Sequence, residues 1–249
     1  MSILVTRPSP FSDELVTALR HQGRVAWAFP LIEFTSGTQL HILPRRLHTL
    51  ESEDLVFILS QNVIHYSKMI FARINMSWPT KLHYYAIGRS TALAFENTSG
   101  RAALWPKEKE TSEVLIRLLP LQAIEGKHAL ILRGNGGRSL LEDTLLRYGA
   151  KVEIIECYQR CQKHYHGDKE GLRWRTEGIH TLVVTSGEML KQLYLLFSVT
   201  DREEWLLKCR LVVVSERLNM LALDLGWTKI HIASGADNKA LLDAILIDT

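Results

Sequence analysis

The chain has 249 residues, of which 46% are hydrophobic and 23% charged, an ordinary globular composition that suits one or two domains. Its net charge is only +3 and its Lys and Arg residues form no basic block, so the sequence gives no sign of a nucleic-acid-binding arm. We expect a cytoplasmic protein, because there is no signal peptide, no apolar run near the ~20 residues that cross a bilayer, and an odd number of cysteines.

Short apolar strands alternate with helix-length segments along the chain. The sequence predicts strands at 3–5, 25–29, 55–59, 84–87, 128–132, 152–156, 181–184, 211–214 and 229–232, and clear helices at 12–22, 62–73, 138–148 and 216–225. Gly23, Gly149 and Gly226 each follow a helix and suit its C-terminal cap. Strands that are apolar throughout, alternating with helices, predict an α/β protein whose parallel sheets are covered on both faces.

Two segments interrupt this alternation and suggest where the chain passes between two lobes. Residues 33–40 (EFTSGTQL) are polar and turn-rich, and 154–166 (IIECYQRCQKHYH) form an extended stretch that no helix follows at once. We therefore expect one discontinuous domain of 1–35 plus 167–249 and a second of 41–153, with 36–40 and 154–166 as linkers. The competing layout is a contiguous division near residue 124.

Polar turns lie where predicted strands run into helices. The clear junctions are Thr6–Ser9, Ser60–Asn62, Gly88–Thr91, Arg133–Arg138, Thr185–Gly187 and Ser215–Arg217, and looser ones lie at 109–112 and 233–237. Taken singly, each junction is more simply a helix cap than a ligand contact. Together they fall at the carboxyl edge of parallel strands, where ligands bind and where helix N-termini attract anions. Many such junctions suit a molecule with several carboxylates.

Other kinds of site fit less well. RGNGGR at 133–138 matches neither of the glycine-rich nucleotide-binding motifs, GxGxxG and GxxxxGK(S/T). A nucleotide-dependent enzyme is therefore only the third hypothesis for the function. His164 and His166 lack a third metal ligand, and Cys157 and Cys161 lack the spacing of redox or zinc motifs. We expect neither a metal nor an organic cofactor.

The junctions resemble those of the uroporphyrinogen-III synthase family. The motifs that carry the resemblance are LVTRP at 4–8, AIGRSTA at 86–92, ETSE at 110–113, LRGNGGR at 132–138 and ECYQR at 156–160. They occur in the family's order over nearly the whole chain. The resemblance implies two α/β lobes joined by a two-stranded linker. It also implies the ring closure of hydroxymethylbilane, a linear tetrapyrrole, with inversion of its last pyrrole ring and without a cofactor.

The resemblance also implies site residues. Tyr158 matches the family's tyrosine and is the candidate acid for departure of the substrate's hydroxyl group. The candidate substrate-binding residues are Arg7, Ser60, Asn62, Thr91, Arg133, Gly134, Asn135, Gly136, Arg138, Thr185, Ser186 and Ser215. Leu59 and Leu218 stand where many relatives carry threonine, which favours a site dominated by backbone groups and shape.

The implied partners are few. They are the hydroxymethylbilane substrate and a transient contact with the preceding enzyme of the pathway, with no nucleic acid and no membrane. We expect a monomer. The alternative function is a two-lobed cytosolic binding protein that closes on an anionic metabolite without chemistry, because the fold alone does not specify function.

Overall fold

The computed structural model describes residues 2–247, which divide into two compact units. Unit 1 combines the described residues up to Glu33 with those from Cys161 onward, and unit 2 is Phe34–Arg160. The chain passes from one unit to the other within strands β3 (Ile32–Ser36) and β7 (Lys151–Gln162).

Unit 1 is built on a five-stranded sheet in the order β10-β9-β8-β1-β2, and each neighbouring pair of strands is parallel. The strands are β1 (Ser2–Val5), β2 (Val25–Ala28), β8 (Ile179–Val183), β9 (Arg210–Val213) and β10 (Ile230–Ile232). The helices are α1 (Phe11–His21), α7 (Gly167–Thr176), α8 (Gly187–Leu196), α9 (Val199–Glu204), α10 (Glu216–Asp224) and α11 (Asn238–Leu246), with a 3-10 turn at Leu206–Lys208.

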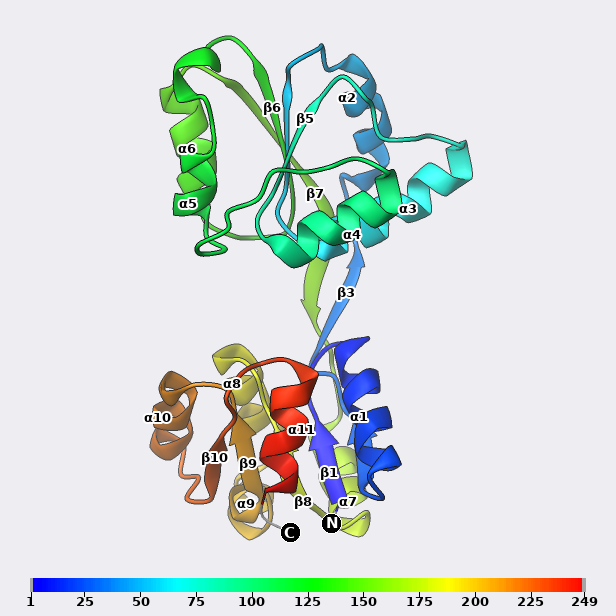
Figure 1. Cartoon of the computed structure of the whole chain (residues 1–249). Helices are drawn as coiled ribbons and strands as arrows, with labels where there is room; N and C mark the ends of the chain where they lie inside the picture. The colour runs from blue at the N-terminus through cyan, green and yellow to red at the C-terminus, as the bar shows by residue number, and fades with distance from the viewer. Residues whose placement is uncertain (1, 248–249) are drawn as a thin grey trace. The chain divides into compact units, whose positions relative to one another are not determined.

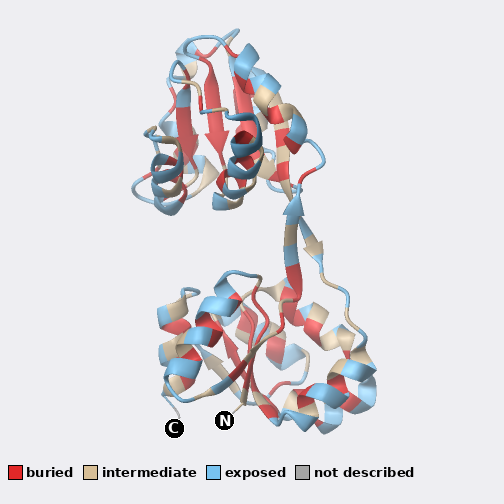
Figure 2. Cartoon of the chain, turned by 90° about the vertical axis from the view of Figure 1, so that its right-hand side faces the viewer, coloured by how far each residue is buried: buried red, intermediate tan, exposed pale blue. Residues whose placement is uncertain are grey.

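Alternate side chains of the unit 1 strands enter two separate cores. Leu4, Leu182 and Leu211 pack against α7, α8 and α10 on one face, whereas Ile3, Val183 and Val212 pack against α1 and α11 on the other. Figure 2 shows this arrangement, with buried strands at the centre and exposed outer faces on the helices. A sheet covered on both faces explains why the residues of its strands are mostly apolar.

Unit 2 contains a sheet in the order β3-β7-β6-β4-β5, in which the β7-β6-β4-β5 part is parallel. Its other strands are β4 (Leu55–Ile58), β5 (His83–Ala86) and β6 (His128–Gly134). Its helices are α2 (Leu43–Thr49), α3 (Gln61–Ile74), α4 (Arg89–Ser99), α5 (Ser112–Arg117) and α6 (Leu140–Arg147), with 3-10 turns at Leu40–Ile42 and Leu121–Ala123.

The helices of unit 2 also cover both faces of its sheet. As Figure 1 shows, α5 and α6 lie on one side of the sheet and α2, α3 and α4 on the other. Phe57, Tyr85 and Ile131 belong to the core under α5 and α6, whereas Ile58 and Leu132 belong to the opposite core. All four predicted helices and nearly all predicted strand ends lie within two residues of their observed bounds.

The prediction of a turn-rich segment at 33–40 is wrong for its first half, because Ile32–Ser36 forms strand β3 beside β7. An edge strand buries few side chains, and in β3 only Ile32 is buried. Its polar composition therefore hid its extended structure. Strand β7 continues from the predicted strand at 152–156 to Gln162, through most of the stretch 154–166 that the sequence predicted to be extended.

Candidate active site

The carboxyl edge of the unit 2 sheet contains a cavity of about 310 Å³. It lies where β4, β5 and β6 end, so several strand–helix junctions contribute to it. The lining residues are Leu59, Ile87, Ser112, Arg133, Gly134, Asn135, Gly136, Gly137, Arg138 and Tyr158. Six of the predicted site residues, Tyr158 among them, therefore line one cavity.

Tyr158 lies directly against the glycine-rich turn that ends β6. A Cβ atom on Gly134 would come within 2.5 Å of the Tyr158 ring, so only glycine leaves room for the ring in this position. Asn135 fixes the same stretch of β7, because its backbone N–H donates to the Tyr158 carbonyl at 3.1 Å. The Asn135 side chain accepts from the Arg160 N–H at 2.6 Å and donates to the Arg160 carbonyl at 3.3 Å. Asn135 thus holds Tyr158 through the backbone.

Two further aromatic residues surround Tyr158. The Tyr66 ring from α3 lies nearly parallel to the Tyr158 ring, at 12° with centroids 6.3 Å apart. The Phe34 ring from β3 meets it edge-on, with centroids 5.6 Å apart. Sequence reasoning missed both residues, although the i, i+3 spacing of Val63 and Tyr66 in the predicted helix placed them on one face. These rings restrict the orientation of the Tyr158 phenol.

Two arginines give the cavity its positive charge. Arg133 folds over its own turn and donates to the Arg138 carbonyl at 3.4 Å, and its buried Nε has no hydrogen-bond partner among the described residues. Arg138 is exposed and pairs with Glu113 of α5 at 3.0 Å. Hydrogen bonds from the backbone N–H of Glu113 and from the Thr111 hydroxyl, together with Arg138, lower the pKa of the Glu113 carboxyl.

The predicted residues at the start of α3 mainly begin that helix. Ser60 is its N-cap and accepts from the Asn62 N–H at 3.1 Å. Asn62 is half-buried one turn from Leu59, which lines the cavity. The start of α4 is capped by a residue from elsewhere in the chain, because the Arg89 N–H donates to the Glu110 carboxylate at 2.9 Å. Thr91 is buried in the first turn of this helix.

The remaining predicted residues belong to unit 1. The Ser186 and Ser215 hydroxyls cap α8 and α10, accepting from Met189 N–H at 3.2 Å and Leu218 N–H at 3.4 Å. Thr185 is half-buried and precedes the N-cap of α8. Arg7 is only 9% exposed and donates to the Asn238 side chain at 2.5 Å. Burial lowers the Arg7 pKa, which Glu14 and Asp237 partly counter.

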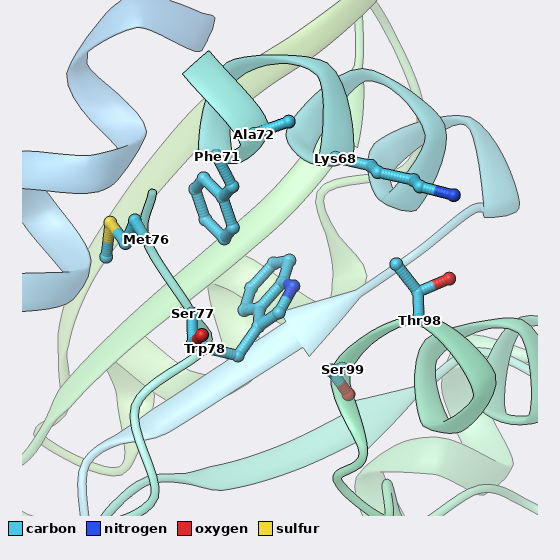
Figure 3. Close-up of a pocket in the computed structure, with 8 residues that line it drawn as sticks. All are labelled: Lys68, Phe71, Ala72, Met76, Ser77, Trp78, Thr98 and Ser99. Atoms are coloured by element: carbon cyan, nitrogen blue, oxygen red, sulfur yellow. The ribbon is translucent and has the colours of Figure 1, made fainter. Parts of the chain in front are cut away.

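A second cavity in unit 2, of about 210 Å³, has different chemistry. Figure 3 shows the Phe71 and Trp78 rings next to each other, with Lys68 and Thr98 at one side. It lies where α3 and α4 end, that is, at the helix C-termini. Exposed helix carbonyls disfavour anions, so this cavity suits a carboxylate-rich ligand less well than the first.

The described residues contain neither a metal-binding cluster nor a membrane-spanning helix. Within 2–247, no group of three or more His, Cys, Asp or Glu side chains is arranged to hold a metal ion. None of the helices described is long and apolar enough to cross a membrane.

The fold and this cavity define a class: α/β proteins with parallel sheets flanked by helices and an arginine-bearing glycine turn beside a tyrosine at one sheet edge. The model of the uroporphyrinogen-III synthase HemD family matches residues 13–243. Similar proteins include uroporphyrinogen-III synthases of Salmonella typhimurium and Escherichia coli, 55% and 54% identical over 245 residues, covering 98% of this chain and all of each relative. This chain belongs to the uroporphyrinogen-III synthase family.

Solved structures agree on the fold. A mutant uroporphyrinogen III synthase from Thermus thermophilus has a TM-score of 0.59 at 14% identity, covering 97% of this chain and 96% of that one. The uroporphyrinogen-III synthetase of Helicobacter pylori has a TM-score of 0.57 at 17% identity, covering 98% of both chains. The predicted α/β class and family are confirmed, and the alternative of a binding protein without chemistry finds no support.

Proposed function

We propose that this chain is a uroporphyrinogen-III synthase, a cyclising lyase of haem biosynthesis that converts hydroxymethylbilane into uroporphyrinogen III. Family membership gives the reaction. We assign this reaction to one cavity at the carboxyl edge of the unit 2 sheet, because Tyr158, Arg133 and Arg138 all line it.

The reaction begins when the terminal hydroxyl group of the substrate leaves as water. The Tyr158 phenol is a hydrogen-bond donor and assists this departure, which gives an electrophilic azafulvene. An acid in this position contributes roughly 10²–10⁴-fold to the rate. The Tyr158 ring is held against Gly134 and beside Tyr66, so its hydroxyl has a defined position before the substrate arrives.

The second part of the reaction is a matter of positioning. The last pyrrole attacks the azafulvene through its substituted carbon and forms a spiro intermediate, which fragments and recloses with that ring inverted. Direct closure at the free carbon would give the wrong isomer. Holding reacting atoms in a productive geometry supplies much of the rate advantage of such a step.

Substrate carboxylates are the groups that the cavity is suited to hold. Arg138, Arg133 and the backbone N–H groups of Gly134 and Gly136 are the donors that we assign to them. Asn135 positions Tyr158, since both polar atoms of its side chain already pair with Arg160. The other candidates are Arg7, Ser60, Asn62, Thr91, Thr185, Ser186 and Ser215, which act mainly through the helix starts that they shape.

The same proposal covers the organisation and surroundings of the chain. Units 1 and 2 are its two lobes. The linkers are 36–40, which begins at the last residue of β3, and 154–166, most of which lies in β7. The enzyme acts as a cytoplasmic monomer without a metal or organic cofactor, and it receives its unstable substrate through transient contact with the preceding enzyme. Cys157 and Cys209 carry free thiols, which supports a reducing compartment.

Product analysis tests the proposed function. The purified chain is incubated with freshly made hydroxymethylbilane and a chelator, and the porphyrins are separated by isomer after oxidation. The proposal predicts mainly isomer III. Formation of isomer I alone, at the rate seen without protein, would refute it.

A further inference from the structure

The arginine at the mouth of the cavity is already paired with a carboxylate of the protein itself. Arg138 Nη1 lies 3.0 Å from Glu113 Oε1, and the two side chains are 76% and 48% exposed. Ser112, the residue before Glu113, lines the same cavity. A ligand carboxylate that binds Arg138 therefore shares this guanidinium with Glu113 or displaces it.

A second carboxylate from the same short segment lies at the start of α4. The Arg89 N–H donates to Glu110 Oε1 at 2.9 Å, and a Cβ atom on Gly88 would lie 2.2 Å from Glu110 Oε2. The N-terminus of a helix favours negative charge, so this is another position that attracts an anion. Residues 110–113 thus place two of the protein's own carboxylates beside the cavity that we assign to the substrate.

We infer that Glu113 is an internal competitor for Arg138, which a carboxylate of the tetrapyrrole displaces on binding. This inference rests on the proposed function, because it assumes that the cavity binds a polycarboxylate. Exposed ion pairs are weak, typically contributing about 0–1 kcal/mol, so exchange of one carboxylate for another is easy. Glu113 keeps Arg138 paired in the free protein and lowers the affinity for ligand and product alike.

The test is a double-mutant cycle on ligand binding. The probe is uroporphyrin III, the stable oxidised form of the product, and its dissociation constant is measured by fluorescence quenching. Glu113→Gln frees Arg138 and is expected to tighten binding about two- to five-fold, the factor that corresponds to loss of an exposed ion pair. Arg138→Gln is expected to weaken binding, and in the double variant Glu113→Gln has no further effect.

A matched control removes the general effect of charge. Glu153 pairs with Arg46 at 2.8 Å in the same unit, with exposed fractions of 40% and 46%, and neither residue lines the cavity. Glu153→Gln removes the same charge and is expected to leave the dissociation constant unchanged. Circular dichroism confirms that each variant is folded.

The outcomes separate the two proposals. The competitor role would be overturned if Glu113→Gln bound uroporphyrin III no more tightly than the wild type, or if Glu153→Gln tightened binding equally. In either case, turnover of hydroxymethylbilane to isomer III would leave the proposed function standing. Tighter binding that requires Arg138, in a protein that forms no isomer III, would keep the competitor role and overturn the proposed function.

Discussion

At the scale of single residues, the site depends on how Tyr158 is held. Its ring rests on a glycine that admits no Cβ, and Tyr66 and Phe34 enclose it. The tyrosine and the glycine turn were predictable from the sequence, because both belong to recognisable motifs. The two aromatic neighbours were not, because α3 and β3 contact β7 only in the folded unit.

The phenol of Tyr158 is expected to matter more for turnover than for stability. Tyr158→Phe keeps the ring contacts but removes the donor, so the turnover number should fall by about 10²-fold, the low end of acid assistance. Initial-rate assays with hydroxymethylbilane measure this. Tyr148→Phe, at an exposed position outside the cavity, is the control. Equal rates for Tyr158→Phe and the wild type would remove the phenol from the mechanism.

Gly134 is expected to act through Tyr158. Gly134→Ala brings a methyl group within 2.5 Å of the Tyr158 ring and must shift it, so turnover should fall. Because both changes affect one group, Gly134→Ala combined with Tyr158→Phe should cost much less than the product of the single losses. Kinetics of the three variants check this, and multiplicative losses would contradict it.

At the scale of elements, many polar side chains at the junctions serve the helices. Ser60, Ser186 and Ser215 each accept a hydrogen bond from the first turn of their own helix. The sequence predicted that these helices start at the carboxyl ends of strands, because apolar strands followed by capping residues are local signals. It did not distinguish a cap from a ligand contact, since the same hydroxyl group suits both roles.

Mutation of a capping serine can distinguish a helix cap from a substrate ligand. Ser60→Ala should lower the free energy of unfolding by about 1 kcal/mol through the lost cap on α3, with little change in turnover. Urea denaturation and initial rates measure the two effects. Ser186→Ala is the matched change at the start of α8. A large loss of turnover with unchanged stability would instead make Ser60 a substrate ligand.

At the scale of the whole molecule, each unit has its own cores on the two faces of its sheet. The alternation of strands and helices predicted both sheets, because a parallel sheet needs a crossover between strands. The place where the chain changes units was harder to predict. It lies inside strands β3 and β7, and a strand that runs on between units has no local signal at the boundary.

Two buried thiols, one in each unit, allow the unfolding of the two units to be measured separately. Burial raises the pKa of Cys157 in unit 2 and Cys209 in unit 1 to about 12, so at pH 8 each stays protonated and unreactive in the folded protein. Each should become reactive as its own unit unfolds. Thiol labelling across a urea series, read by mass spectrometry, measures both. Rapid labelling of either thiol without urea would contradict this.

The proposed function places the substrate's carboxylates and reacting ring in the cavity formed by residues 133–138 and Tyr158. The most direct measurement is a crystal structure of the protein with uroporphyrin III bound. We predict a carboxylate of the ligand at Arg138, with Glu113 displaced, and a macrocycle within contact of the Tyr158 hydroxyl. A bound ligand that touches neither Tyr158 nor any residue of the 133–138 turn would contradict this location of the active site.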